Sequence, residues 1–157
     1  QGVAFEALDA ASLDRDRWRQ IFVLSNLRGL VRGDELLPSY RLKLTGIPGL
    51  KLHWRHHLRP LLEALPEGPL WELLPGEFAD LLKGWDRPRH SVEILDSCGR
   101  PISHFSKKYR GLTARWILAH DQGEPARVQR GKIPGCRWEG ARDNDTGGRC
   151  LRLVVLP

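Results

Sequence analysis

The sequence predicts a mixed α/β or α+β protein, folded as a single compact domain with a mixed sheet, flanking helices and a positively charged cleft. Short apolar runs bounded by turn residues indicate strands, and apolar residues at helical spacing indicate helices between them. These elements alternate without a strict β-α-β order, which is why the class is mixed. With 157 residues, 41% of them hydrophobic, the chain is long enough to bury one core, and we expect one domain over residues 1–157.

The first elements are a helix and a loop. Apolar positions recur at helical spacing over residues 13–24, and Ser12 or Asp14 is a suitable N-cap, so we expect a helix that leads into a short strand. Residues 25–33 contain two glycines and two arginines, which predicts a tight loop or a short helical turn beside a charged ligand. Residues 36–44 continue as an irregular stretch of apolar and basic residues.

The middle of the chain predicts a helix followed by strands. Residues 52–65 have helical spacing, and Pro60 either kinks this helix or begins a second one. Residues 70–74 and 91–95 have the apolar character of buried strands, and residues 76–82 predict a short helix between them.

The last third predicts one long amphipathic helix and a closing strand. A turn at residues 96–101 favours a hairpin whose second strand covers residues 102–105. The helix follows at residues 106–120. Residues 121–148 are rich in Gly, Pro, Asp and Arg and predict a loop, and residues 151–156 regain strand character.

The net charge of +6 favours polyanionic partners, although 19 acidic residues make the excess over 25 Lys and Arg moderate. Three cysteines, Cys98, Cys136 and Cys150, are odd in number and form no Cys-x-x-Cys pair, which predicts reduced thiols in a cytoplasm rather than a disulfide framework or a zinc site. Apolar runs are far shorter than the roughly 20 residues of a membrane span, and no leader opens the chain. We therefore expect a cytoplasmic protein without a membrane partner.

Basic residues concentrate in the segment from His104 to Trp116, which contains four Lys and Arg and no acidic residue. On a helix, one side of this segment is expected to be exposed and cationic, and this side holds Lys108, Gly111 and Arg115, with Lys107 at its edge. The opposite side is an apolar stripe suited to packing, and it holds Tyr109, Leu112 and Trp116.

A second basic window holds Arg28, Arg32, Arg41 and Lys43. If the two windows adjoin in space, they form a positive cleft that can follow a phosphate backbone. Aromatic residues near the windows, which are Tyr40, Phe105 and Tyr109, offer either stacking surfaces or core packing. Gly111 within a helix indicates either the close approach of a phosphate or another backbone, or a packing glycine.

Two other groups of residues have weaker chemical signals. His53 and His57 have the i, i+4 spacing of a metal pair, but no third ligand is evident and the pattern favours exposed histidines, so we expect neither a metal nor another cofactor. The carboxylates of Glu72, Glu77 and Asp80 suit acid-base chemistry if they converge, but surface charges and ion pairs are the commoner role. The sequence contains no nucleophile elbow, P-loop or dinucleotide fingerprint.

The basic windows also carry a family resemblance. Residues 105–115, Phe-Ser-Lys-Lys-Tyr-Arg-Gly-Leu-Thr-Ala-Arg, resemble the aromatic-Ala-Lys-Lys-Ala-Arg-Gly-Leu-x-x-Arg signature of the YaaA peroxide stress protein family. Residues 23–32 with 40–42 resemble its Val-Leu-Ser-Gly-Leu-Tyr-Gly-Val-Leu-Arg-Pro block and its Pro-Tyr-Arg-Leu. The chain departs from the family at four positions, where a glycine, a tyrosine, a proline and an acidic residue are replaced by Asn26, Arg28, Gly33 and Lys43.

The resemblance implies a cytoplasmic protein that protects against hydrogen peroxide, lowers free intracellular iron and binds DNA. It also implies a compact mixed α/β fold with a positive cleft and a helix-hairpin-helix-like element, and it implies no enzymatic activity. The family's opening Ser-Pro-Ala-Lys segment has no counterpart, so we expect the chain to be the C-terminal part of a longer YaaA-like domain.

We therefore expect contacts to duplex or single-stranded DNA with weak sequence preference, and we assign no catalytic residue. The predicted nucleic-acid-binding residues are Arg28, Arg32, Tyr40, Arg41, Lys107, Lys108, Arg110, Gly111 and Arg115. The alternative is an enzyme acting on a phosphorylated or carboxylated small substrate in the same cleft, clamped by Lys107, Lys108 and Arg115 with Glu72 or Glu77 as acid or base. A third hypothesis is direct iron binding through His53, His57 and carboxylates.

Overall fold

The computed structural model describes residues 2–103 and 105–157. The chain divides into two compact units. Unit 1 comprises Gln1–Leu13, Gly68–Leu73 and Asp86–Pro157, and unit 2 comprises Asp14–Glu67 and Leu74–Trp85. Both units combine helices with strands, so the expected α+β class is confirmed.

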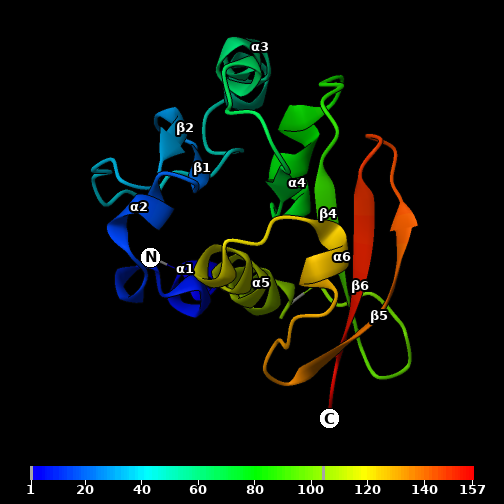
Figure 1. Cartoon of the computed structure of the whole chain (residues 1–157). Coiled ribbons are helices and arrows are strands. Elements are labelled where there is room, and N and C mark those ends of the chain that lie inside the picture. The colour runs from blue at the N-terminus through cyan, green and yellow to red at the C-terminus, as the bar shows by residue number, and fades with distance from the viewer. Residues whose placement is uncertain (1, 104) are drawn as a thin grey trace. The chain divides into compact units, whose positions relative to one another are not determined.

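Unit 1 is built on a four-stranded mixed sheet in the order β3-β4-β6-β5 (Figure 1). Strands β3, β4 and β6 run parallel to one another, and β5 is antiparallel to β6. The strands cover Trp71–Glu72 for β3, His90–Leu95 for β4, Cys136–Asp143 for β5 and Arg149–Val155 for β6. The predicted strands over 70–74, 91–95 and 151–156 are therefore present, and β3 is shorter than expected.

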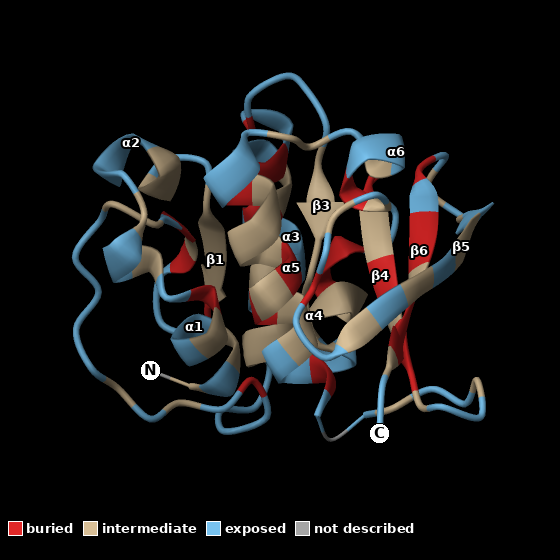
Figure 2. Cartoon of the chain, turned by 60° about the horizontal axis from the view of Figure 1, so that its bottom comes forward, coloured by how far each residue is buried: buried red, intermediate tan, exposed pale blue. Residues whose placement is uncertain are grey.

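Helix α5, Ser106–His120, supplies the core of unit 1. Its Tyr109, Leu112 and Trp116 pack against a cluster that includes Val92 and Ile94 of β4 and Leu153 of β6. Figure 2 shows buried stretches on β4 and β6, whereas the residues of β5 are intermediate or exposed. The predicted helix and its apolar stripe are confirmed, because the stripe is the face that the sheet covers.

Helix α1, Val3–Leu8, packs along α5 in unit 1. The turn after it places Asp9 in the left-handed region at φ 45°, and a short 3-10 helix η1, Ala10–Ser12, follows. The sequence did not predict α1, because a helix of six residues has too few turns to show a periodicity. Helices this short are stabilised by tertiary packing rather than by propensity.

The loop predicted over residues 121–148 is wrong, because this segment contains helix α6, Pro125–Val128, and strand β5. Pro125 begins α6 at a position where the missing N–H costs nothing. Strand β5 lacks the β-branched residues that indicate strands, and it forms because β6 offers a partner. Its register shifts between Trp138 and Gly140, which marks a bulge.

The hairpin predicted after β4 forms only in part. Asp96 accepts hydrogen bonds from the N–H groups of Cys98 and Arg100 at 2.9 Å each, which fixes the expected turn. Beyond it, Ile102 donates to the carbonyl of Ile94 at 2.9 Å and Pro101 makes an isolated bridge, but residues 102, 103 and 105 are not in a strand. Pro101 has no N–H, so it cannot continue a ladder.

Unit 2 contains a β-hairpin and helices. Its elements are α2 Arg15–Trp18, β1 Phe22–Ser25, β2 Gly29–Arg32, α3 Leu50–Glu63, α4 Gly76–Ala79 and the 3-10 helix η2 Asp80–Leu82. The helix expected over 13–24 is a single turn that leads into β1. The tight loop expected over 25–33 is confirmed only at residues 26–28, because Gly29–Arg32 form β2, which pairs antiparallel with β1. Helix α3 continues through Pro60 and ends three residues later, so no second helix begins there.

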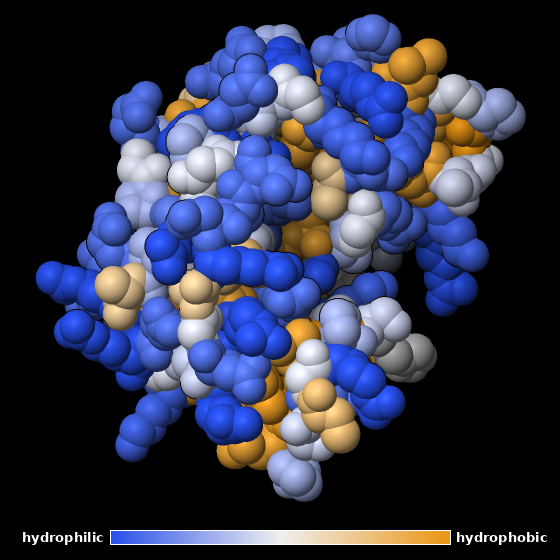
Figure 3. Space-filling view, turned by 90° about the vertical axis from the view of Figure 1, so that its right-hand side faces the viewer, coloured by the Kyte–Doolittle hydropathy of each residue, from blue (hydrophilic) through white to orange (hydrophobic). Residues whose placement is uncertain are grey.

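The helices, the surface and the cysteines of the described residues give three further findings. No helix in residues 2–103 and 105–157 combines the length and the apolar character that crossing a membrane requires. Figure 3 shows a mostly hydrophilic face with separate small hydrophobic patches. Cys98, Cys136 and Cys150 are free thiols.

Candidate nucleic-acid interface

The basic window of unit 2 is carried by the β1–β2 hairpin and the segment after it. Ser25, the last residue of β1, holds the turn, because its Oγ accepts the N–H groups of Leu27 at 3.2 Å and Arg28 at 3.1 Å. The Tyr40 hydroxyl lies 2.7 Å from the same Oγ, and either hydroxyl can donate. Tyr40 therefore ties the irregular segment to the turn.

Asn26 and Trp54 fix the other side of this turn. The Asn26 side chain donates to the carbonyl of Leu42 at 2.8 Å, and the Trp54 indole donates to the carbonyl of Asn26 at 2.9 Å. Gly29 has φ 76°, and a Cβ at this position would lie 2.7 Å from the Trp54 ring. Only glycine satisfies both conditions without strain. The sequence did not identify Trp54 as part of this scaffold, since its partner lies 28 positions away.

The β1–β2 hairpin and the segment after it present three exposed arginines. Arg28 donates one hydrogen bond, to the carbonyl of Leu36 at 3.2 Å, so no carboxylate that the structure describes neutralises it. Arg32 pairs with Asp34 at 2.5 Å, and this hydrogen bond raises the pKa of Arg32 and lowers the pKa of Asp34. Arg41 is exposed. Arg28 and Arg41 are the better placed of the three to attract a further anion.

In unit 1, the first turn of α5 holds the exposed Lys107 and Lys108. This turn contains no acidic residue, and within the described residues no side-chain hydrogen bond caps it. Ser106 does not act as a cap, because its Oγ donates instead to the carbonyl of Ser103 at 2.8 Å. The positive end of a helix dipole favours anions, so two lysines at this position add to an attraction that the backbone already exerts. His104, at the start of the predicted basic segment, lies outside the described residues.

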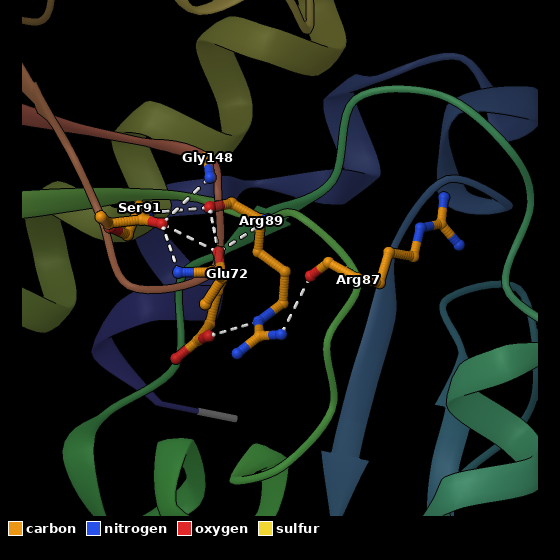
Figure 4. Close-up of polar contacts among 7 residues, drawn as sticks. Glu72, Arg87, Arg89, Ser91 and Gly148 are labelled. Atoms are coloured by element: carbon orange, nitrogen blue, oxygen red, sulfur yellow. Dashed lines mark hydrogen bonds and ion pairs between the residues drawn. The ribbon is translucent and has the colours of Figure 1, made fainter.

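Arg110 has a different environment from the two lysines. It is half-buried, and burial lowers its pKa, while the charge of Glu72 acts in the opposite direction. Glu72 pairs with the buried Arg89 at 3.0 Å, and Arg89 also donates to the carbonyl of Arg87 at 3.0 Å (Figure 4). The structure thus gives Glu72 the role of an ion-pair partner within unit 1.

A polar turn encloses the backbone of Arg89. The carbonyl of Arg89 accepts hydrogen bonds from the side chains of Asn144 at 2.8 Å and Thr146 at 3.1 Å. Gly148 approaches the Arg89 backbone so closely that a Cβ on Gly148 would overlap it. These contacts join the start of β4 to the β5–β6 turn. No pattern in the sequence indicates this cluster, because a buried arginine is recognised only once its carboxylate partner is located.

Gly111 is buried against α1, and the partly exposed Arg115 also contacts α1. A Cβ on Gly111 would overlap the carbonyl oxygen of Ala4 and lie 2.9 Å from the Cβ of Ala7, so Gly111 permits the close approach of another backbone. The expectation that Arg115 lies on an exposed face is wrong. Its guanidinium closes the C-terminal end of α1, donating to the carbonyls of Leu8 at 3.1 Å and Asp9 at 3.0 Å, to the Asp9 carboxylate at 3.2 Å and to Ser12 Oγ at 2.6 Å.

The other residues that the sequence offers as candidates for acid-base or metal chemistry make separate contacts. Asp80 pairs with Lys51 and Lys83 at 2.7 Å each, and these hydrogen bonds lower its pKa to about 2. The rings of His53 and His57 stack with centroids 4.1 Å apart, and His57 Nδ1 donates to the carbonyl of His53 at 2.8 Å. In the part of the chain that the structure describes, no three His, Cys, Asp or Glu side chains are grouped as a metal site would require.

The structure therefore groups the predicted residues into two sets. Arg28, Arg32, Tyr40 and Arg41 lie in unit 2, and the five residues of α5 lie in unit 1. The expected cleft needs both sets, so it stays a prediction.

Comparison with known proteins gives a consistent family. The family model described as Peroxide stress protein YaaA matches residues 1–141. A UPF0246 protein of Streptomyces coelicolor is 37% identical over 134 residues, which are 75% of this chain and 50% of that protein. A UPF0246 protein of Corynebacterium glutamicum is 29% identical over 133 residues, covering 78% of this chain and 54% of its own length. The chain spans about half the length of these relatives.

Proposed function

This chain belongs to the YaaA peroxide stress protein family, and from that membership and its two basic surfaces we propose that it binds DNA in the cytoplasm during peroxide stress and helps to limit free iron. The DNA contacts are to phosphate and sugar, so they have little sequence preference. The observation that carries the proposal is the first turn of α5, where Lys107 and Lys108 are exposed and no side chain of the described residues caps the helix.

Three further cations are proposed to contact phosphates, namely Arg28, Arg32 and Arg41 of unit 2. Arg32 must exchange part of its pairing with Asp34 for a phosphate, whereas Arg28 and Arg41 are not held by a carboxylate within the described residues. The other predicted residues position these surfaces. Tyr40 holds the β1–β2 turn, Arg110 lies in the field of Glu72, and Gly111 and Arg115 hold α1 against α5.

The test is a salt titration of binding to duplex and single-stranded DNA. If each of the five cations contacts one phosphate, log affinity should fall with log salt at a slope of about −4.5 on duplex DNA. Neutralising the α5 lysines with Lys107→Gln/Lys108→Gln should reduce the slope to about −2.7 and weaken binding about 60-fold at 0.1 M salt, because two counterions fewer are released.

The matched control is Arg142→Gln/Arg149→Gln, which removes the same charge from exposed arginines of β5 and β6. It should leave the slope near that of the native protein. Binding that does not respond to salt, or an equal loss in both double variants, would show that the α5 turn is not the contact.

The cellular part of the proposal has its own readout. Cells without the protein should be more sensitive to hydrogen peroxide and should contain more chelatable iron, and the native protein but not Lys107→Gln/Lys108→Gln should restore both. If the double variant also restores peroxide resistance and the iron level, iron limitation does not depend on the DNA contacts of Lys107 and Lys108.

A further inference from the structure

The C-terminal end of α5 carries a second feature, which the predicted DNA contacts do not include. A pocket of about 390 Å³ lies between this end and α6, wholly within unit 1. It is lined by Trp116, His120, Gln122, Arg127 and Arg130. Lys107 and His120 are 13 positions apart on one helix, which at 1.5 Å per residue separates this pocket from the α5 lysines by about 20 Å.

One wall of the pocket is an ordered aromatic stack. The rings of Trp116 and His120 are nearly parallel, at 18°, with centroids 4.4 Å apart. His120 Nδ1 is 2.8 Å from the carbonyl of Trp116, and since a carbonyl only accepts, Nδ1 is the donor. Gly131 packs directly against the Trp116 ring, because a Cβ added to Gly131 would lie only 2.8 Å from the indole Cδ2. The stack is therefore fixed before any ligand arrives, which lowers the entropy cost of binding.

The other wall is cationic. Arg127 donates to the side-chain oxygen of Gln122 at 3.1 Å, which orients the guanidinium without neutralising it. Arg130 is exposed, and its guanidinium forms no hydrogen bond or ion pair with any residue that the structure describes. The acidic residues of the preceding loop, Asp121 and Glu124, do not line the pocket. Two guanidinium groups thus stand beside an aromatic stack with no carboxylate among the lining residues.

We propose that this pocket binds a nucleotide, with the base on the Trp116–His120 stack and the phosphate on Arg127 and Arg130. A flat aromatic surface recognises a base through stacking, and guanidinium groups recognise phosphate through paired hydrogen bonds. The volume is in the range of pockets for small ligands. The bound nucleotide is either free or a unit of a single strand, since both present the same base and phosphate. The inference does not depend on the DNA contacts of Lys107 and Lys108.

The experiment titrates the full chain with adenosine 5′-monophosphate, adenosine and ribose 5-phosphate, following the tryptophan indole resonances by NMR. The monophosphate should bind more tightly than either fragment. Arg127→Gln/Arg130→Gln should weaken the monophosphate at least about fivefold and leave adenosine unchanged, because only the phosphate contact is lost. His120→Ala should weaken both the monophosphate and adenosine at least about fivefold through loss of stacking.

The control is again Arg142→Gln/Arg149→Gln, which should bind the monophosphate like the native protein. A six-residue deoxyadenosine strand distinguishes the two sources, since preference for the strand identifies a single-strand site and preference for the monophosphate identifies a free nucleotide. The inference is overturned if neither probe binds, or if both probes bind equally well to the native protein and to Arg127→Gln/Arg130→Gln. Because Lys107 and Lys108 are native in every variant, this result is independent of the duplex titration.

Discussion

Replacing Gly111 by alanine should destabilise the protein, although helix propensity alone predicts the reverse. Gly111 is an interior residue of α5, where alanine is favoured over glycine by about 1 kcal/mol. Against this, the added Cβ would overlap the carbonyl oxygen of Ala4 and lie 2.9 Å from the Cβ of Ala7. The sign of the effect therefore depends on whether α1 can move away.

Two contacts make that movement costly. The overlapping atom belongs to the backbone of Ala4, so no change of rotamer relieves it, and the whole of α1 must shift. That shift would also strain the hydrogen bonds from Arg115 to the carbonyls of Leu8 and Asp9. Overpacking costs about 1–3 kcal/mol, and a backbone overlap that no rotamer relieves belongs to the upper part of this range, about 2–3 kcal/mol. With the propensity gain of about 1 kcal/mol subtracted, we expect a net loss of about 1–2 kcal/mol.

Urea unfolding followed by circular dichroism measures this difference. With a slope near 2 kcal/mol per M, the midpoint of Gly111→Ala should fall by about 0.5–1 M. Gly76→Ala is the matched control, because Gly76 is also helical and no atom lies within 4 Å of its added Cβ. Its midpoint should be unchanged or slightly higher.

A midpoint for Gly111→Ala at or above that of the native protein would refute the reasoning. The double variant Gly111→Ala/Ala7→Gly refines the test. Removing the Ala7 methyl leaves the Ala4 carbonyl in place, so stability should not return. Full recovery would mean that the side-chain contact, and not the backbone contact, sets the cost.

Two further predictions concern charged side chains. Arg115→Ala should destabilise the protein by about 1 kcal/mol, since the α1 carbonyls lose their shared donor, and should speed amide hydrogen exchange in α1; unchanged exchange would contradict the capping role. Lys51 and Lys83 lower the pKa of Asp80 from 3.8 to about 2. The contribution of the Asp80 carboxylate to folding stability is therefore present above the pKa of the unfolded state and is lost as the pH falls through about 2. Thermal denaturation of the native protein should therefore show a stability loss between these pH values that Asp80→Asn reduces, and equal acid profiles would argue against the pairing.

The sequence predicted the elements whose pattern is local. Helix α5 has the predicted bounds, because its apolar residues repeat at helical spacing and one face must be covered. Strand β6 has an apolar run that only burial explains. Strand β5 and helix α1 were not predicted, since each forms through contacts with another element and not through a pattern of its own. Pairing with β6 makes Cys136–Asp143 a strand, and packing on α5 makes Val3–Leu8 a helix.

For the candidate interface, the sequence located basic residues but could not assign their partners. Lys107 and Lys108 are exposed as expected. Arg115 was placed on the same arc by its spacing, yet its guanidinium contacts residues more than 100 positions away, which no helical wheel can show. The pocket between α5 and α6 was missed for a related reason, because α6 lies in a segment whose composition indicated a loop.

The bond between Arg115 and the end of α1 also bears on how the chain is made. The donor and the Leu8 carbonyl are 107 positions apart. At a synthesis rate of about 5–20 residues per second, α1 leaves the ribosome about 5–20 s before α5 can cover it. During that interval α1 lacks the packing that a six-residue helix requires, so it becomes helical late, when the chain reaches α5. Helix α1 thus becomes helical only after α5 has been synthesised.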